Sequence, residues 1–318
     1  MSIKILKTGI LDTVQDCGRF GHRRLGFGPG GPMDPTAFMI ANTLAGNDAC
    51  AAALEFSFPS PVLEFSRDTV ISICGANFQP SINGIEIDGW GPRIIRKGDR
   101  LSFKKNIFGR FAYLAVSGGI ISETILGSAS TNPKVPIGDR CGRALMKGET
   151  LEVGRGSSTH VSGKFAAGYS IRPKYSEAPT IRVTPGPEIE SLDTNSIEKL
   201  EEMDFTVTNS SDRMGYRLSG NLTRLPESSS MLSSPVTFGT IQAPADGNPI
   251  VLMADHQTTG GYPRIAQILV TDIPLLAQLQ PGRRLGFKFV TSDHAAELLT
   301  ERNRDLRMLA LASRNVLK

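Results

Sequence analysis

A run of short apolar segments between residues 52 and 120 constrains the fold of this chain more than any other feature. The segments LEFSF, VLEF, TVISIC, GIEI, RLSF and FAYLAVSGGI are separated by proline, Asn-Gly and Gly-Asp turns. Asn83-Gly84 is the dipeptide most typical of a two-residue hairpin. Strands of this length and spacing, with almost no helical pattern between them, predict a β-barrel or a β-sandwich.

The rest of the chain divides around one segment without periodicity. With 318 residues, 40% of them apolar, the chain can bury one large core or two ordinary ones. Residues 156–179 show neither helical nor strand periodicity and are predicted to be a linker. We therefore expect an N-terminal β subdomain over 1–155, a C-terminal β subdomain over 180–292, and a helical tail over 293–318.

Charge and cysteine usage exclude several classes of protein. The net charge of +4, from 35 basic and 31 acidic residues, is too nearly balanced to predict a nucleic-acid or membrane surface. No run of eighteen apolar residues is present. The four cysteines, Cys17, Cys50, Cys74 and Cys141, contain no Cys-x-x-Cys pair. We expect them to be free thiols that pack as small hydrophobic groups, in a reducing cytoplasm.

A short helix is predicted directly after a glycine-rich loop. Asp34 is a good N-cap, Pro35 suits the first turn, and Gly46 suits the left-handed stop, so the helix is expected over about 35–45. The preceding loop, Gly28-Pro29-Gly30-Gly31, would then lie at the positive end of the helix dipole and could hold a carboxylate or phosphate. Alternatively, Asp34 already satisfies the free amides and the glycines only turn the chain.

The stretch FGTIQAPADGNPIVLMADHQTTGGYP, over 238–263, is the best candidate for a functional site. It joins a polar turn, an apolar strand and a loop dense in hydrogen-bonding groups. Such a loop on a rigid scaffold usually presents its side chains to a ligand or partner. The chain has no His-Glu-x-x-His or Cys-pair metal motif, no Gly-x-Ser-x-Gly elbow and no complete phosphate loop. No metal site is predicted.

Several residue types in these loops suit acid–base and anion chemistry. A general base is expected from Asp16, Asp246 or Asp255, with His256 as a proton shuttle. Arg19 or Arg213 would bind an anion, and the amides of Gly30-Gly31 and Gly260-Gly261 would form an oxyanion or phosphate cradle. Each has a structural alternative, because aspartates before glycine often shape turns and buried arginines often pair internally. The functional interpretation requires these loops, from both halves of the chain, to converge on one cleft.

Five sequence blocks resemble the signatures of a known family. The blocks TVQDCGRFGHRRLG, GGPMDP, SDRMGYRL, GTIQAPADGNP and ADHQTTGGYPRIA follow the order found in the family of bacterial 5-oxoprolinase C subunits. This is also called the biotin-dependent carboxyltransferase or allophanate hydrolase subunit 2 family, and it includes the antagonist of a sporulation-kinase inhibitor. Cys17 and His22 stand where the family more commonly has Leu and Tyr.

The resemblance implies a fold and an activity. The fold would be two cyclophilin-like β-barrels with a few short helices. The activity would be ATP-dependent opening of the 5-oxoproline lactam to glutamate, as a hydrolase subunit that works with the A and B subunits and uses ATP and magnesium at the level of the complex. The alternatives are a carboxyltransferase acting on urea or another amide, and a non-catalytic regulator that binds a kinase-inhibitor-like protein. Biotin would come from a partner, because Lys147 is not in an Ala-Met-Lys-Met site.

The residues and the resemblance together give a predicted site. The predicted catalytic residues are Asp16, Asp246, His256 and Gln257, and the predicted substrate- or anion-binding residues are Arg19, Gly30, Gly31, Asp212, Arg213, Thr258, Thr259, Gly260, Gly261 and Tyr262.

Overall fold

The protein, in a computed structural model, is mainly β and divides into two compact units. The structure describes residues 1–317 except 138, 157–159, 221 and 223–230. Unit 1 contains Met1–Arg19, Gly30–Pro173 and Asn303–Lys318, and unit 2 contains Phe20–Pro29 and Lys174–Arg302. Each unit is thus assembled from separate stretches of chain, where the sequence suggested a simple division near residue 155.

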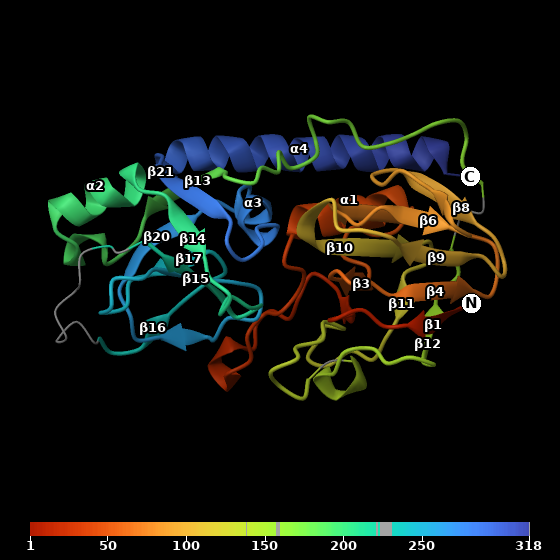
Figure 1. Ribbon diagram of the computed structural model, residues 1–318, viewed down its shortest axis with the longest axis horizontal. Helices are drawn as coiled ribbons and strands as arrows, with labels where there is room; N and C mark the ends of the chain where they lie inside the picture. The colour runs from red at the N-terminus through yellow and green to blue at the C-terminus, as the bar shows by residue number, and fades with distance from the viewer. Residues whose placement is uncertain (138, 157–159, 221, 223–230, 318) are drawn as a thin grey trace. The chain divides into compact units, whose positions relative to one another are not determined.

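Unit 1 is built from two antiparallel sheets (Figure 1). The seven-stranded sheet has the order β11 (Ile120–Ile121), β12 (Thr150–Val153), β1 (Ser2–Lys7), β4 (Val62–Phe65), β9 (Arg100–Phe103), β6 (Pro80–Ile82) and β7 (Ile85–Glu86). The five-stranded sheet has the order β2 (Thr13–Gln15), β3 (Ala53–Phe56), β10 (Phe108–Val116), β5 (Thr69–Asn77) and β8 (Pro92–Ile95). Asn83 and Gly84 turn the chain between β6 and β7 with positive φ at both residues, so the predicted hairpin is confirmed.

The core of unit 1 is formed by apolar side chains from both sheets. Ile5 from β1 and Phe56 from β3 are fully buried in the same cluster. Helix α1 (Pro35–Leu44) packs on β5 and β10, where Phe38 meets Tyr113 edge to face. Its start is set by Asp34, whose side chain accepts a hydrogen bond from the Ala37 amide. The helix therefore lies where its capping signals predicted.

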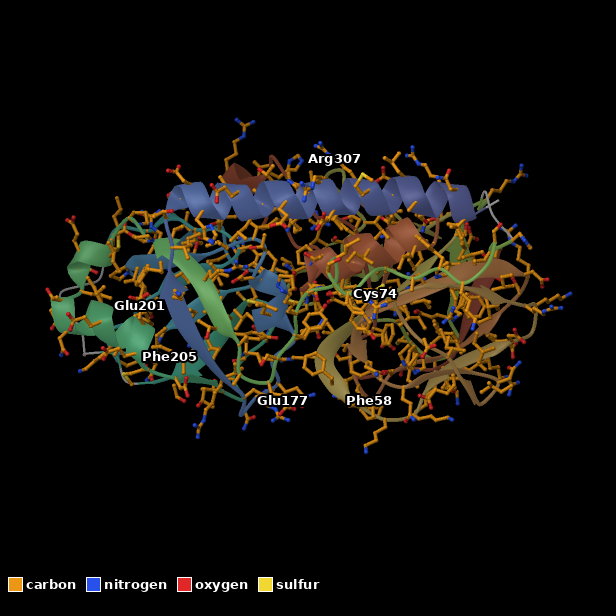
Figure 2. The ribbon with its side chains drawn as sticks, turned by 90° about the horizontal axis from the view of Figure 1, so that it is seen from above. Phe58, Cys74, Glu177, Glu201, Phe205 and Arg307 are labelled. Carbon is orange, nitrogen blue, oxygen red and sulfur yellow. A yellow bond between two sulfur atoms is a disulfide. The ribbon has the colours of Figure 1, made fainter. Side chains whose placement is uncertain are left out.

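Unit 2 is a closed seven-stranded barrel (Figure 1). Its order is β13 (Thr180–Pro185), β20 (Arg264–Ile268), β17 (Thr240–Gln242), β18 (Ile250–Leu252), β15 (Gly215–Ser219), β14 (Phe205–Val207) and β21 (Arg284–Phe289). A parallel pairing of β13 with β21 closes the ring. Phe205 from β14 packs against Phe287 from β21 with ring centroids 5.4 Å apart (Figure 2). The expected strand-dominated fold is confirmed, with closure giving every strand two neighbours.

The remaining elements decorate the two units. They are β16 (Ser234–Pro235), β19 (Thr259–Gly260), α2 (Thr194–Glu202), α3 (Ile273–Ala277), α4 (Ser292–Val316) and the 3-10 turns η1 (Arg23–Leu25), η2 (Asp139–Gly142) and η3 (Ile189–Ser191). Helix α4 is the predicted helical tail; in unit 1, Ser313 donates a hydrogen bond of 2.7 Å to the Thr43 carbonyl. Among the described residues, no helix is long and apolar enough to cross a membrane.

The predicted linker is divided between the units, with its described residues up to Pro173 in unit 1 and those from Lys174 in unit 2. Ala167 is buried, and its amide donates a hydrogen bond of 2.8 Å to the Trp90 carbonyl. The Arg172 guanidinium lies 5.5 Å from the centre of the Trp90 ring and 4.6 Å from that of Tyr169. Residues 162–173 contain no helix or strand, which accounts for the absence of periodicity in this part of the sequence.

Candidate functional site

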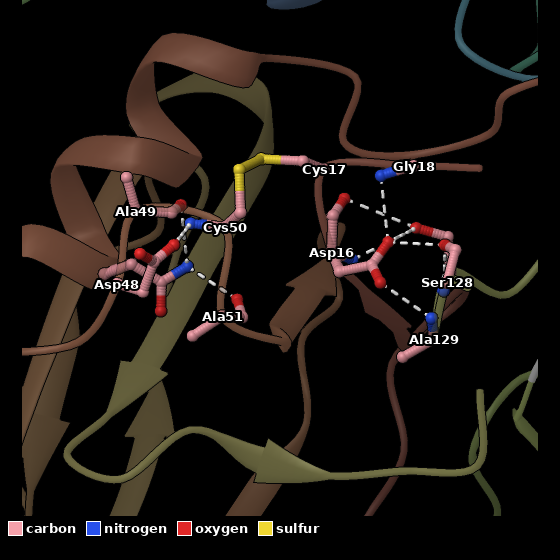
Figure 3. Close-up of a disulfide and its surroundings, with 11 residues drawn as sticks. Asp16, Cys17, Gly18, Asp48, Ala49, Cys50, Ala51, Ser128 and Ala129 are labelled. Carbon is pink, nitrogen blue, oxygen red and sulfur yellow. Dashed lines mark hydrogen bonds between the residues drawn. A yellow bond between two sulfur atoms is a disulfide. The ribbon is translucent and has the colours of Figure 1, made fainter. Parts of the chain in front are cut away.

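Asp16 in unit 1 lies at the centre of a hydrogen-bond network (Figure 3). Its Oδ1 accepts hydrogen bonds from the Gly18 amide at 2.9 Å and from the Ser128 and Ser130 hydroxyls at 2.6 Å each. Its Oδ2 accepts one from the Ala129 amide at 2.7 Å. Both carboxylate oxygens are therefore used to hold residues 128–130. This geometry favours a structural role for Asp16 over the predicted role of general base.

Arg19 holds the same loop from its other side. The guanidinium is 2% exposed and donates to the carbonyls of Ile125, at 3.1 Å from Nε, and Ser130, at 2.8 Å from Nη2. These two nitrogen atoms of Arg19 therefore donate to backbone carbonyl oxygens and not to an anion. The arrangement favours internal support over the anion binding expected from the sequence.

The amides at the start of α1 are occupied. The Met33 amide donates to the Glu55 carboxylate at 2.8 Å, and the Asp34 amide donates to the Tyr113 hydroxyl at 2.7 Å. Since Asp34 also accepts the Ala37 amide, these three amides are satisfied within unit 1, which favours the alternative of a loop that only turns the chain. Gly31 has a φ of 93°, and a Cβ there would lie 3.3 Å from the Cys17 carbonyl oxygen. Anion binding by the Gly30 and Gly31 amides stays a prediction.

The expectation of four free thiols is wrong for two of the cysteines. Cys17 and Cys50 form a disulfide within unit 1, with Cα atoms 5.0 Å apart (Figure 3). The residues are 33 positions apart, and spacing alone could not reveal that the fold brings them together. Cys74 is buried, and burial raises the pKa of its thiol to about 12, as befits a small hydrophobic group (Figure 2). Cys141 is exposed.

In unit 2, Arg213 and Asp255 form a buried ion pair. Nε of Arg213 lies 2.7 Å from Oδ2 of Asp255, and Nη2 lies 3.1 Å from Oδ1. The side chains are 5% and 0% exposed. The Asp255 amide also donates to the Arg213 carbonyl at 2.8 Å, so the two loops are joined by backbone and side chain. The pair favours the alternative in which a buried arginine is neutralised internally.

Two other predicted aspartates shape turns. Oδ1 of Asp212 accepts the Met214 amide at 2.8 Å, and Oδ1 of Asp246 accepts the Asn248 amide at 3.0 Å. Both are side-chain-to-backbone bonds two residues along the chain, typical of an Asx turn. Asp246 is nevertheless exposed, so its second oxygen can face a ligand.

His256 is the predicted site residue with the most distinctive environment. Its side chain is buried, and Nδ1 lies 2.5 Å from the Gln257 carbonyl oxygen. Because a carbonyl can only accept, Nδ1 carries the proton and Nε2 of the neutral ring has the lone pair. Burial lowers the pKa of His256 below its ordinary value, and the Arg23 charge lowers it further, while the hydrogen bond to Gln257 and the Asp255 charge act in the opposite direction. The neutral ring therefore presents a proton acceptor.

Arg23 is the residue that sequence reasoning missed. It belongs to Phe20–Pro29, the stretch of early chain that forms part of unit 2. Its Nη2 donates to the Thr258 carbonyl at 3.3 Å, so it lies beside the His256 loop. The available signal was the His22-Arg23-Arg24 triplet directly after a glycine-rich block, but nothing in the sequence distinguished Arg23 from its neighbours.

The loop after His256 is open to solvent at alternate positions. Gln257, Thr259 and Tyr262 are exposed, Thr258 and Gly261 are half-buried, and Gly260 is buried. Gly260 pairs with Ser234 across β16 and β19, and a Cβ at Gly260 would lie 2.4 Å from Nε2 of Gln242. A side chain at this position would displace the buried Gln242 amide group, so packing favours glycine here independently of any cradle for an anion.

The predicted residues fall into two groups. Unit 1 holds Asp16, Arg19, Gly30 and Gly31, and unit 2 holds Asp212, Arg213, Asp246, His256, Gln257, Thr258, Thr259, Gly260, Gly261 and Tyr262. The convergence of the two groups on one cleft stays a prediction. Within the part of the chain that the structure describes, no three His, Cys, Asp or Glu side chains form a group that could hold a metal ion.

Comparison with solved structures defines the class of protein. The fold is similar to part of the Kluyveromyces lactis urea carboxylase, with a TM-score of 0.89 and 29% identity over 100% of this chain and 30% of that chain. It is similar to the K. lactis urea amidolyase with a TM-score of 0.88 and 29% identity over 97% of this chain and 20% of that one. The chain therefore belongs to a class of proteins whose fold also occurs as one part of urea carboxylase and urea amidolyase.

Sequence comparison defines the family. Residues 25–289 match the carboxyltransferase domain, subdomain A and B, and the chain belongs to this family. It is 36% identical to the 5-oxoprolinase C subunit of Escherichia coli over 97% of both chains. It is 33% identical to the 5-oxoprolinase C subunit of Haemophilus influenzae, covering 93% of this chain and 94% of the relative. Against urea amidolyase of Saccharomyces cerevisiae, 30% identity covers 90% of this chain but 16% of that protein.

Proposed function

We propose that this chain is the C subunit of an ATP-dependent 5-oxoprolinase, acting with the A and B subunits in the cytoplasm. The observation that carries the proposal is its end-to-end similarity to two bacterial C subunits, each matched over more than nine tenths of its length. The similarity to urea amidolyase is confined to a small part of that much longer protein. A chain that matches the whole of one protein and a fragment of another is best assigned the role of the first.

The proposed reaction opens a lactam that water alone attacks slowly. An amide is a poor electrophile, and transfer of the ATP γ-phosphoryl group to the lactam oxygen would make the carbonyl carbon reactive. Water then adds, the ring C–N bond breaks, and a second water releases phosphate from the acyl phosphate. The sum is 5-oxoproline, ATP and two waters giving glutamate, ADP and phosphate. Magnesium and ATP are assigned to the complex, not to this chain.

His256 is the proposed proton carrier in this reaction. Its Nδ1 proton is held by the Gln257 carbonyl, which leaves Nε2 to take a proton from the attacking water. His256 would then donate this proton to the lactam nitrogen when the lactam C–N bond breaks. The exposed side chains of Gln257 and Asp246, with Thr258, Thr259 and Tyr262 near them in sequence, are proposed to contact the substrate.

The test is reconstitution from purified components. The chain, candidate A and B subunits, ATP, magnesium and 5-oxoproline are expected to release glutamate only when all are present. Gln257→Ala and Asp246→Ala are each expected to abolish turnover with an unchanged thermal midpoint. Normal turnover in both variants would remove the loop from the site while leaving the assignment of the chain as a C subunit intact.

A carboxyltransferase is the second candidate, and the similarity to urea carboxylase is the observation that favours it. In that case a biotin-bearing partner would supply the carboxyl group for urea or another amide. Avidin would then inhibit the reconstituted reaction, whereas a 5-oxoprolinase would be insensitive to avidin. Tight binding of a partner with neither activity would identify a regulator instead.

A further inference from the structure

Arg23 differs from Arg19, which donates to two backbone carbonyls at 2.8 and 3.1 Å, and from Arg213, which pairs with Asp255. Among the described residues, its only hydrogen bond is the one from Nη2 to the Thr258 carbonyl, and it makes no ion pair. The side chain is half-buried. A guanidinium is charged at every physiological pH and presents five donors in a plane. Most of the donors of Arg23 are therefore available to an anion from outside the chain.

The backbone around Arg23 is fixed against the His256 loop. The turn η1 is closed by hydrogen bonds from the Leu25 amide to the His22 carbonyl, at 3.0 Å, and from the Gly26 amide to the Arg23 carbonyl, at 2.9 Å. Further along, Gly28 lies so close to the loop that a Cβ would be 2.6 Å from the His256 carbonyl oxygen. Close contact at Gly28 and a hydrogen bond at Arg23 hold this segment at two points.

Two charged side chains near the His256 ring affect its pKa, and an added anion would change their balance. Arg23 disfavours the charged form of the ring, and Asp255 favours it. Asp255 is already neutralised by Arg213 through two hydrogen bonds. An anion beside Arg23 would therefore offset the Arg23 charge at the ring and leave the buried Arg213–Asp255 pair in place.

We propose that Arg23 is the carboxylate-binding residue of the His256 site, and that it pairs with the carboxylate of a small lactam acid while His256 faces the ring amide. The inference rests on the proposed function for the identity of the substrate, since 5-oxoproline carries both groups. The site itself, a guanidinium without a counter-ion beside a neutral imidazole, is defined by residues of unit 2 alone. Arg19 and Arg213, the two arginines expected from the sequence to bind an anion, are assigned no part in it.

The first experiment follows the His256 ring by NMR in the purified full-length chain. The chain has four histidines, and a His256→Gln variant assigns the resonance. Saturating 5-oxoproline is expected to raise the pKa of His256, because the bound carboxylate neutralises Arg23. In Arg23→Ala the pKa is expected to start higher and to show no response to 5-oxoproline. An identical response in the wild type and Arg23→Ala would overturn the proposal, as would no response in the wild type.

The second experiment uses the reconstituted complex. Arg23→Ala is expected to raise the KM for 5-oxoproline about 10- to 100-fold, the usual range for loss of a hydrogen-bonded charge pair, with a smaller change in kcat. Arg23→Lys should recover part of the loss, since it restores the charge but not the planar fork. Arg24→Ala is the matched control, because Arg24 is an exposed arginine on the same turn.

The two experiments separate failure of the inference from failure of the proposed function. Glutamate release by the wild-type complex with an unchanged KM in Arg23→Ala would overturn the assignment of Arg23 and leave the function standing. If the wild-type complex releases no glutamate, acetate replaces 5-oxoproline in the NMR experiment as a bare carboxylate. An Arg23-dependent response to acetate would then support the binding site, and a response that persists in Arg23→Ala would overturn it.

Discussion

Arg19 and Arg23 lie four residues apart in one glycine-rich segment, yet their surroundings are opposite. Arg19, in unit 1, is almost fully buried and donates to backbone carbonyls of residues 125 and 130. Arg23, in unit 2, is half-buried and makes one hydrogen bond, to Thr258. The first is held by the fold, and the second is the one that we propose binds a ligand. Side-chain type alone therefore does not reveal function here, because the partners of each arginine come from more than a hundred residues away.

The same distinction applies to the carboxylates of unit 1. Both oxygens of Asp16 accept hydrogen bonds from residues that are close in space and far apart in sequence. Asp12, four residues earlier, is also buried, but its Oδ1 has no partner among the described residues. Substitutions at satisfied and at unsatisfied polar groups should therefore differ in their effect on stability.

The largest effect is expected at the buried ion pair. Arg213→Met should lower the free energy of unfolding by about 4 kcal/mol, because it leaves the Asp255 charge buried without compensation. Urea denaturation measures the loss. The double variant Arg213→Met, Asp255→Leu is the control and should recover much of the stability. A loss below about 1 kcal/mol in the single variant would mean that Arg213 is not committed to the fold and is open to a ligand.

Reduction of the Cys17–Cys50 disulfide should have the next largest effect. The bond closes a loop of 33 residues beside Asp16, and its loss should lower stability by about 3 kcal/mol. Thermal melts with and without a phosphine reductant measure the change, and Cys141→Ser is the control for the exposed thiol. A cytoplasmic location predicts that the pair is alkylated as free thiols in rapidly quenched cells. An unchanged melt on reduction would show that the hydrogen bonds of Asp16 and Arg19 hold this segment without the covalent link.

Asp12 should make stability depend on pH in the direction opposite to most carboxylates. Burial raises the pKa of Asp12 from 3.8 to about 6, although the Gly9 amide lowers it in part. The folded chain then binds the proton more tightly than the unfolded chain, so this group's contribution falls as pH rises from about 4 to about 6. A shift of this size corresponds to about 3 kcal/mol.

The Asp12→Asn variant isolates that contribution, since asparagine does not titrate. The difference in unfolding free energy between Asp12→Asn and the wild type, measured by urea denaturation at about pH 4 and about pH 7, should shift by about 3 kcal/mol in favour of the variant at the higher pH. A difference that stays constant across this range would show that the carboxyl group is solvated in the folded chain.

The smallest effect on stability is expected at Arg23. Arg23→Ala removes one long hydrogen bond at a half-buried position, so the free energy of unfolding should change by less than about 0.5 kcal/mol. The two arginine variants should therefore differ in kind. Arg213→Met should lower the free energy of unfolding, whereas Arg23→Ala should raise the KM for 5-oxoproline. A loss of about 2 kcal/mol or more would place Arg23 with the structural arginines.

Local signals in the sequence predicted local structure well. Asp34, Pro35 and Gly46 define α1 through capping chemistry that involves only neighbouring residues. Asn83-Gly84 forms its hairpin because these two residues tolerate positive φ at low cost. The strand-rich pattern likewise indicated the mainly β fold, and the closed barrel of unit 2 agrees with it.

Long-range pairing was beyond reach from a single sequence. Nothing in the spacing of Cys17 and Cys50 indicated a disulfide, and nothing indicated that Asp255 neutralises Arg213. His256 was selected for its polar, glycine-rich setting, and its role stays a prediction. Arg23 was not selected, because its contact with Thr258 joins residues that are 235 positions apart in the chain.

That separation has a consequence for synthesis on the ribosome. The contacts of Phe20–Pro29 with residues 256–258 cannot form on the ribosome until some 235 further residues have been added. At typical elongation rates this delay is about 10 to 50 s. During that interval the nascent chain carries Phe20 and Leu25, both largely exposed even in the finished protein, next to two arginines. Over that interval the hydrogen bond of Arg23 to Thr258 and the close approach of Gly28 to His256 are both missing.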